Sequence, residues 1–265
     1  MVTDAIRLYL NINMTKNHSF VKCTLIFLLG ALCGSCITCI VFKYGNEAIS
    51  IVSQYLSNTG ETEYGTEQNN VEGEYHGIDV SNHQGEISWE KVALNKNIQF
   101  VYVKATEGAT YQDKRYDENV TGAKANGILV GSYHYLRNTS LIREQFRNFR
   151  NVAKKENQDL IAMVDVEEKV EKDSILLFCD LVKEHYGRRP IIYGTNRSYN
   201  LYCAPDFNDY YLMIGRYGDN PPVIKGEGHY NIWQYSEKGK IDGIPKLVDL
   251  DRFHPDFKLS NLKLK

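Results

Sequence analysis

The amino-acid sequence predicts an α/β fold: a TIM-like β/α barrel with shortened or missing helices in its second half, preceded by an N-terminal transmembrane helix. Three observations lead to this prediction. A long uncharged apolar run lies near the N-terminus. Eight short apolar runs follow it, with helical stretches between the first five. Acidic residues recur where several of these runs end.

The first apolar run, "CTLIFLLGALCGSCITCIVF" at 23–42, carries no charge. Its length of about 20 residues is enough for a helix to span a bilayer. Arg7, Lys16 and Lys22 precede it, which predicts a cytoplasmic segment at 1–22 and a single-pass protein whose C-terminal part lies outside the cytoplasm. A cleaved signal peptide, which would leave a secreted protein, is the alternative. The run is long for a signal peptide, and no small-x-small cleavage site follows it.

Residues 43–74 are polar and acidic, and they predict a linker to a single domain at 75–265. The formal net charge of -2 gives no sign of a nucleic-acid partner, and we expect the domain to be monomeric. Four of the six cysteines fall within 23–42. Whether the other two, Cys179 and Cys203, form a disulfide is left open by the sequence.

The eight later runs are short enough to be strands. Strands that alternate with helices predict a parallel sheet, and about eight of them predict closure into a barrel. An open doubly wound sheet is the alternative, but no glycine-rich phosphate loop follows the first run. The expected strands are 76–81, 98–108, 128–136, 160–167, 189–195, 210–218, 230–236 and 246–253, and the expected helices lie within 86–97, 113–126, 140–156 and 173–187.

The segment "IAMVDVEE" at 161–168 ends a buried strand with acidic residues. Because side chains alternate along a strand, Asp165 and Glu167 point to one face with Met163, and the valines between them point to the other. In a barrel the outer face packs under helices, which suits the valines. The two acids are therefore predicted to face inward at the C-terminal mouth, where barrel enzymes hold their active sites.

Other predicted strands end in the same way. Asp79 lies in the first strand, Glu107 ends the second with Lys104 nearby, and Asp249 and Asp251 lie in the last on a shared face. The first and last strands are neighbours in a closed barrel, so these acids are predicted to gather with those of the fourth. Aromatic residues near the strand ends could stack on sugars; they are Tyr133, Tyr135, Tyr193, Tyr217, Trp233 and Tyr235.

A cluster of carboxylates flanked by aromatic rings suits hydrolysis of a glycosidic bond. One carboxylic acid protonates the leaving oxygen while another carboxylate stabilises the positive charge at the anomeric carbon. Crowded like charges keep one carboxyl protonated at neutral pH. A magnesium or calcium site made of carboxylates is the rival use. The spacing of a zinc site is absent, so His83 and His134 are interpreted as polar lining or core residues, and no metal or cofactor is predicted.

Seven motifs along the chain add a family resemblance. They are "GIDVSNHQG" (77–85), "VYVKATEG" (101–108), "GSYHYL" (131–136), "MVDVE" (163–167), "IIYG" (191–194), "IWQYS" (232–236) and "VDLDRF" (248–253). With these motifs in this order, the chain resembles glycoside hydrolase family 25, the Chalaropsis-type lysozymes or N-acetylmuramidases. The resemblance covers nearly all of 75–255.

The resemblance implies a peptidoglycan hydrolase that cleaves the β-1,4 bond between N-acetylmuramic acid and N-acetylglucosamine. It implies that Glu167 is the general acid and that Asp165 orients the N-acetyl group of the substrate. Asp79 and Asp249 complete the carboxylate set, with Asp249 favoured over Asp251. The Asp-x-Glu spacing is similar to that of glycosidases whose substrate supplies its own acetamido oxygen as nucleophile, which would retain the anomeric configuration. The implied substrate-binding residues are Tyr135, Tyr193, Trp233, Lys104 and Glu107. For Lys104 and Glu107 the alternative is a structural role, in which they pair with each other at the barrel mouth.

Two other functions remain as alternatives. One is a non-catalytic glycan-binding module on a barrel scaffold, although the presence of both Asp165 and Glu167 argues against it. The other is a hydrolase of a different N-acetylated polysaccharide such as chitin. The expected partners are glycan strands of peptidoglycan and, through the N-terminal helix, a membrane.

Overall fold

The computed structural model describes residues 75–264. The predicted cytoplasmic segment at 1–22, transmembrane helix at 23–42 and linker at 43–74 all lie outside the described residues. Within the described part of the chain, no helix is both long enough and apolar enough to cross a membrane.

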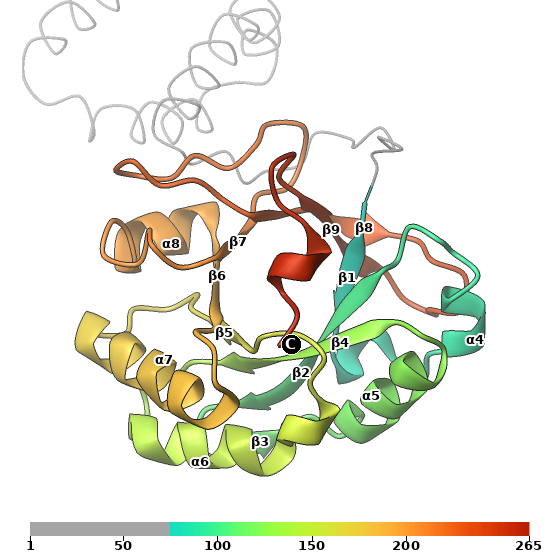
Figure 1. Ribbon diagram of the computed structural model, residues 1–265, viewed down its shortest axis with the longest axis horizontal. Helices are drawn as coiled ribbons and strands as arrows, with labels where there is room; N and C mark the ends of the chain where they lie inside the picture. Colours follow the sequence, from blue (N-terminus) through green and yellow to red (C-terminus); the bar gives the residue numbers. More distant parts are fainter. Residues whose placement is uncertain (1–74, 265) are drawn as a thin grey trace, which may run out of the picture. The chain divides into compact units, whose positions relative to one another are not determined.

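Residues 75–264 form a closed eight-stranded barrel with one short additional strand at its edge (Figure 1). The strand order is β1, β9, β8, β7, β6, β5, β4, β2, and β1 pairs with β2 to close the ring. Each of the eight predicted apolar runs overlaps one barrel strand, so the predicted barrel is confirmed. The strands are β1 (Gly77–Val80), β2 (Phe100–Glu107), β3 (Tyr111–Gln112), β4 (Leu129–Tyr135), β5 (Met163–Asp165), β6 (Ile191–Thr195), β7 (Leu212–Gly215), β8 (Ile232–Gly239) and β9 (Val248–Phe253).

The prediction of a parallel sheet is correct for β1, β2 and β4 to β8 but wrong for β9. β9 runs antiparallel to both of its neighbours, β8 and β1. The connection at 240–247 contains no helix, and a parallel connection needs a crossover of a dozen or more residues. The first residues of β9 therefore lie at the mouth of the barrel. The short hairpin strand β3, which pairs with the end of β2, was not predicted.

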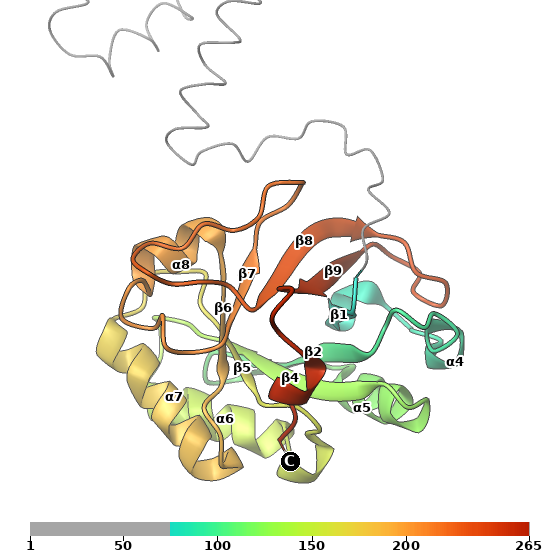
Figure 2. The same cartoon turned by 45° about the horizontal axis from the view of Figure 1, so that its top comes forward.

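The helices cover the barrel unevenly. Figures 1 and 2 show α5, α6 and α7 along the outside of one part of the ring, and in the described chain no helix follows β7 or β8. The longest helix, α7, ends at Gly187, whose φ of 88° is a left-handed conformation that glycine adopts without a Cβ clash. The α-helices are α4 (Trp89–Val92), α5 (Tyr116–Ala125), α6 (Ile142–Val152), α7 (Lys172–Tyr186) and α8 (Asn196–Tyr202), and the 3-10 helices are Asn82–Gln84, Lys155–Asn157 and Leu259–Asn261.

The strands bury both of their faces in two separate apolar layers. Val164 and Val166 belong to the outer layer under the helices, whereas Met163 belongs to the inner layer that fills the barrel. This confirms the alternation predicted for β5. It also explains why the strand sequences are nearly continuous apolar runs, as is typical of parallel sheets covered on both sides.

The C-terminal segment closes the end of the barrel opposite the mouth. Because β9 is antiparallel, the chain leaves it at the N-terminal ends of the other strands. There Phe257 and Leu262 join the inner layer, and the Leu262 carbonyl accepts a 2.8 Å hydrogen bond from the Ile161 amide. Figure 1 shows this segment inside the ring of strands. The side chains at the C-terminal ends of the parallel strands are left facing the open end.

Candidate active site

The structure brings the four predicted carboxyl side chains together at the mouth. Asp79 on β1 lies opposite Asp249 on β9, Asp165 is the last residue of β5, and Glu167 follows it by two residues. Asp79 and Asp165 are buried, Asp249 is partly buried and Glu167 is exposed. The charge of Glu167 raises the pKa of each of the three aspartates, which places all four within one electrostatic cluster.

Burial is the main reason that these aspartates hold protons more tightly than usual. Burial raises the pKa of Asp79 to about 6 and that of Asp249 to about 8, and it raises the pKa of Asp165 well above its ordinary value. A hydrogen bond donated by Gln234 lowers the pKa of Asp79 and so partly offsets the effect of burial. The cluster therefore retains protons near neutral pH, which is what acid catalysis of glycoside hydrolysis requires.

Asp251 lies deeper in the barrel than Asp249. Its register partners are Gly77 and Gln234, and its side chain is fully buried. Neither of its carboxyl oxygens has a hydrogen-bond partner among the described residues. Burial, with the nearby charges of Asp79 and Asp249, raises its pKa well above the ordinary value. The alternation of side chains puts Asp249 and Asp251 on the same strand face. The structure places Asp249, and not Asp251, at the mouth.

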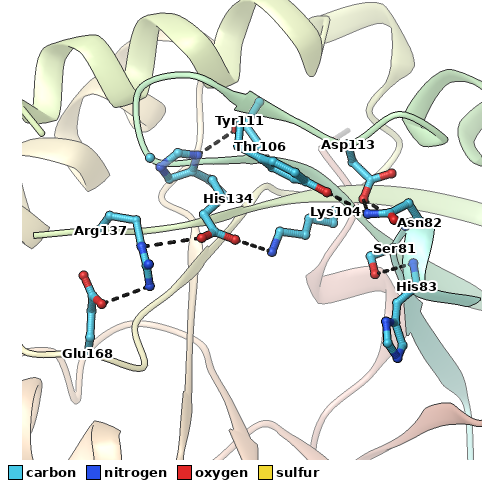
Figure 3. Close-up of polar contacts among 12 residues, drawn as sticks. Ser81, Asn82, His83, Lys104, Thr106, Tyr111, Asp113, His134, Arg137 and Glu168 are labelled. Carbon is cyan, nitrogen blue, oxygen red and sulfur yellow. Dashed lines mark hydrogen bonds and ion pairs between the residues drawn. The ribbon is translucent and has the colours of Figure 1, made fainter. Parts of the chain in front are cut away.

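A chain of ion pairs forms part of the rim (Figure 3). Lys104 Nζ lies 2.8 Å from Glu107 Oε2, Arg137 Nε lies 3.4 Å from Glu107 Oε1, and Arg137 Nη1 lies 3.1 Å from Glu168 Oε2. Both cations lie near the ring of Tyr135, with Lys104 Nζ 5.1 Å and the Arg137 guanidinium 5.4 Å from its centroid. Lys104 and Glu107 thus pair with each other and help to hold Tyr135.

A second group of polar contacts holds the loop that follows β1. The backbone amide and the Nδ2 of Asn82 each donate a 2.8 Å hydrogen bond to Asp113 Oδ2, and Nδ2 also donates to the Tyr111 hydroxyl at 2.7 Å. Within the loop, the His83 amide donates to Ser81 Oγ. These residues appear on the right of Figure 3. They tie the end of β1, which carries Asp79, to the β2–β3 hairpin.

Tyr193 lies inside the barrel beside the carboxylate cluster. It is the register partner of Asp165, and its hydroxyl donates a 2.7 Å hydrogen bond to Gln234 Oε1. Burial and the charges of neighbouring groups, among them Asp165, Glu167 and Asp79, raise its pKa. Tyr193 is thus placed among the acids with which the sequence grouped it.

Trp233 lies on the opposite face of β8 from the carboxylate cluster. Ile232 and Gln234 face the barrel interior, so the intervening tryptophan faces outward. Its Nε1 donates a 2.6 Å hydrogen bond to the Arg216 carbonyl, and the Arg252 guanidinium lies 3.9 Å from its ring centroid. The structure therefore does not bring Trp233 together with the other predicted substrate-binding residues.

The two histidines have different surroundings. His134 is fully buried, with Nδ1 2.7 Å from Thr106 Oγ1 and Nε2 3.1 Å from Gln145 Oε1, and burial lowers its pKa to about 4. It is a core residue with both ring nitrogens paired, as interpreted from the sequence, whereas His83 is exposed. Within residues 75–264, no group of three or more His, Cys, Asp or Glu side chains could hold a metal ion.

Sequence reasoning missed several residues that contact the predicted site. Gln234 donates a 2.7 Å hydrogen bond to Asp79 Oδ2, and Arg137 and Glu168 extend the ion-pair chain of the rim. For Gln234 a signal was present, because it alternates with Ile232 in "IWQYS" and is therefore a polar residue on a buried face. No comparable signal marks Arg137 or Glu168, which lie in loops.

Comparison with known proteins gives one consistent assignment. The model of the family "Glycosyl hydrolases family 25" matches residues 78–244. The uncharacterized protein YegX of Escherichia coli K12 is 32% identical over 189 residues, covering 68% of this chain and 69% of the relative. Lysozyme M1 of Streptomyces globisporus is 30% identical over 199 residues, covering 67% of each chain. The crystal structure of the bacterial lysozyme from Streptomyces coelicolor is 29% identical and superposes with a TM-score of 0.64 over 72% of this chain and 96% of that one. The chain therefore belongs to glycosyl hydrolases family 25, and it is a glycoside hydrolase.

Proposed function

We propose that this glycoside hydrolase is a muramidase that cleaves the β-1,4 bond between N-acetylmuramic acid and N-acetylglucosamine in peptidoglycan. The observation that carries the proposal is the cluster of Asp79, Asp165, Glu167 and Asp249 at the barrel mouth. The similarity to proteins named lysozymes supports peptidoglycan as the substrate. A binding module would have no use for several buried carboxyls with raised pKa values.

Glu167 is proposed as the general acid. Of the four carboxyl groups it is the exposed one, so it can meet the glycosidic oxygen of a bound glycan. Its proton passes to that oxygen as the bond to the anomeric carbon breaks, and the leaving sugar departs as a neutral alcohol.

Asp165 is proposed to orient the acetamido group of the sugar whose bond is cleaved. Its side chain is buried, and its Oδ1 has no hydrogen-bond partner among the described residues, so it can accept the acetamido N–H. The acetamido oxygen then attacks the anomeric carbon and forms a cyclic oxazolinium ion. Water opens this ion from the opposite side and gives its proton to the Glu167 carboxylate, so the general acid is restored and the overall reaction retains the anomeric configuration.

Asp79 and Asp249 are proposed to stabilise the positive charge that develops during the reaction. The pKa of Asp79 is about 6, so it carries a negative charge at neutral pH. The pKa of Asp249 is about 8, so it keeps its proton under the same conditions and avoids a second charge beside the first. With one carboxyl ionised and the other protonated, the pair supplies one negative charge and avoids repulsion between two charges.

The sugar-binding surface is proposed to include the rim around Tyr135. Lys104 and Arg137 both lie near this half-buried ring, and Tyr135 is the register partner of both Glu107 and Asp165. A ring held at the mouth beside the acids can stack on a sugar face. Tyr193 lies deeper and acts from inside the barrel, and Trp233 would contribute by supporting β8 from outside.

We also propose, on the hydropathy of 23–42, that this segment holds a monomeric hydrolase domain at the outer face of a membrane. Secretion after signal cleavage is the alternative. Alkaline carbonate extraction of cell membranes tests this: the anchored protein stays in the pellet, whereas a cleaved protein is soluble and lacks the N-terminal residues in its mass spectrum.

Substrate class is tested with purified peptidoglycan and purified chitin. We expect the full chain to release soluble fragments and reducing ends from peptidoglycan and not from chitin. Release from chitin instead would assign another N-acetylated polysaccharide as substrate. Binding to insoluble peptidoglycan without release of fragments, by a folded protein, would favour the glycan-binding module.

A further inference from the structure

A chain of hydrogen bonds crosses the interior of the barrel beneath the carboxylate cluster. The Tyr193 hydroxyl on β6 donates to Gln234 Oε1 on β8 at 2.7 Å, and Gln234 Nε2 donates to Asp79 Oδ2 on β1 at 2.7 Å. The three side chains are 6%, 3% and 9% exposed, so their contacts are shielded from water. Shielded hydrogen bonds to a charged group are stronger than those at a surface.

The tyrosine decides which end of the Gln234 amide faces Asp79. A side-chain amide has one accepting oxygen and one donating nitrogen. The Tyr193 hydroxyl donates to Oε1, and the Tyr217 hydroxyl lies 3.4 Å from the same oxygen. With its oxygen engaged on that side, Gln234 presents its Nε2 to Asp79, whose ionised carboxylate can only accept.

Gly215 makes this arrangement possible. β7 lies between β6 and β8, so Tyr193 must reach Gln234 across it. A Cβ at position 215 would lie 2.7 Å from the Tyr193 hydroxyl and 3.0 Å from Gln234 Oε1. The first distance is too short for a real Cβ contact and the second is unusually tight, so a larger side chain would displace the Tyr193 hydroxyl and crowd Gln234. A glycine inside a strand is typical of such a close approach.

We propose that Gln234 is a positioning residue for Asp79, and that Tyr193 and the side-chain-free position at Gly215 hold it in that role. Gln234 fixes the direction in which the Asp79 carboxylate points and keeps it in the hydrogen-bond-accepting form. This assignment rests on the proposed function of the cluster, but it concerns a contact within the protein that can be measured without substrate.

The other groups around Asp79 are mostly acidic. Asp249 and Asp251 approach from β9, Asp165 and Glu167 from β5 and the residues after it, and the hydroxyls of Tyr133, Tyr193 and Tyr217 from β4, β6 and the loop after β7. Against these groups and against burial, the donated hydrogen bond of Gln234 lowers the pKa of Asp79. Loss of this bond therefore raises that pKa.

Two single variants and their combination test the chain in the full-length protein. Gln234→Met keeps the volume of the side chain and removes the donor, and Tyr193→Phe removes the hydroxyl that orients it. We expect each to move the acidic limb of the kcat/KM profile on peptidoglycan to higher pH, by about one unit for Gln234→Met. Because Tyr193 acts on Asp79 through Gln234, the double variant should shift the limb no further than Gln234→Met alone.

The matched control is Gln158→Met. Gln158 is also a buried amide, and its Nε2 donates to Ser132 Oγ at 2.8 Å and to the Tyr116 hydroxyl at 3.2 Å, in the layer outside the barrel. Gln158→Met removes a buried, hydrogen-bonded amide, as Gln234→Met does, but we expect it to leave the pH profile of kcat/KM unchanged. A shift of the limb by this control would show that general loss of stability, and not the contact with Asp79, moves the profile.

Melting temperatures give the readout that needs no activity. A carboxyl with a raised folded-state pKa costs stability as pH rises above its unfolded pKa, and the cost grows until the folded pKa is passed. The melting temperature of Gln234→Met should therefore fall further below that of the wild type between about pH 5 and about pH 8, while the deficit of Gln158→Met stays constant.

The outcomes separate the two proposals. Wild-type protein without activity on peptidoglycan would overturn the proposed function, and the melting series would still decide the role of Gln234. A widening deficit for Gln234→Met, with a non-additive double variant, establishes the positioning role. A pH-independent deficit equal to that of Gln158→Met overturns it, whatever the activity.

Discussion

Asp79 on β1 and Asp249 on β9 are direct partners in an antiparallel pair of strands. Like charges opposite each other destabilise a sheet, and both side chains are also removed from most of the solvent. The molecule tolerates this because the pair does not ionise together: the pKa of Asp79 is about 6 and that of Asp249 about 8. The reversed direction of the last strand is what creates this pair at the barrel mouth.

Replacing Glu167 with Gln should abolish most of the activity. The amide keeps the shape of the side chain but has no proton to transfer, and proton transfer contributes about a hundredfold or more to the rate. Initial rates of reducing-end release from peptidoglycan measure the effect, with circular dichroism to verify folding.

The neighbouring residue offers a matched control for that variant. Glu168 accepts hydrogen bonds from Arg137 Nη1 at 3.1 Å and from the Asn138 amide at 2.7 Å, so its role is to hold the rim. Glu168→Gln should lose less than about tenfold in rate, because a partly exposed ion pair contributes little to stability and Glu168 does not transfer a proton. Equal losses of rate in Glu167→Gln and Glu168→Gln would contradict the assignment of Glu167 as the general acid.

Asp251→Asn should remove a loss of folding stability that grows as the pH rises. The folded-state pKa of Asp251 lies above its unfolded value of 3.8, so the native protein holds the proton longer than the unfolded chain does and loses stability as pH rises. The Asn variant lacks this loss, so its melting temperature relative to the wild type should increase as the pH rises above the unfolded pKa of 3.8. A difference in melting temperature between Asp251→Asn and the wild type that stays flat with pH would contradict the account.

Tyr135→Ala should weaken substrate binding more than it slows the chemical step. The ring lies near both Lys104 and Arg137 and is the proposed platform for a sugar. We expect KM to rise about fivefold to tenfold, as for the loss of one aromatic contact, whereas Tyr135→Phe should keep a KM near that of the wild type. A large effect of the phenylalanine variant would instead assign a role to the hydroxyl.

Cys179 and Cys203 should be found as unreacted thiols in the folded protein. Both are free and buried, and burial raises the pKa of each thiol, that of Cys203 to about 12, so little reactive thiolate forms. Iodoacetamide labelling with peptide mass spectrometry should modify both only after denaturation. Recovery of a peptide that links the two cysteines would contradict the free state.

The barrel could be predicted from the sequence because most of its parallel strands are buried on both faces. Such strands form apolar runs, and "IAMVDVEE" also shows which side chains face inward, as the opposite layers of Val164 and Met163 confirm. The direction of β9 could not be predicted from composition, because a parallel and an antiparallel strand have the same alternation. Only the short connection at 240–247 indicated the antiparallel direction of β9, because it is too short for a parallel crossover.

The part of the candidate site that could be predicted consists of residues whose type alone indicates a catalytic role. Carboxylates at strand ends were found in this way, whereas Gln234 was not, because its importance comes from two partners far away in sequence: Asp79 and Tyr193. The outward face of Trp233 follows from alternation with its neighbours, but a large aromatic residue next to predicted site residues favoured the opposite interpretation. Contacts of this kind depend on the closure of the barrel and not on local sequence.

The most direct test of the central claim is identification of the new sugar end made by the full chain on purified peptidoglycan. Released fragments are reduced with borohydride and analysed by mass spectrometry. A muramidase leaves N-acetylmuramic acid at the reducing end, so the account predicts reduced muramic acid in the wild-type products and almost none with Glu167→Gln. Products that end in reduced N-acetylglucosamine would contradict it, because they come from cleavage of the other bond in the glycan strand.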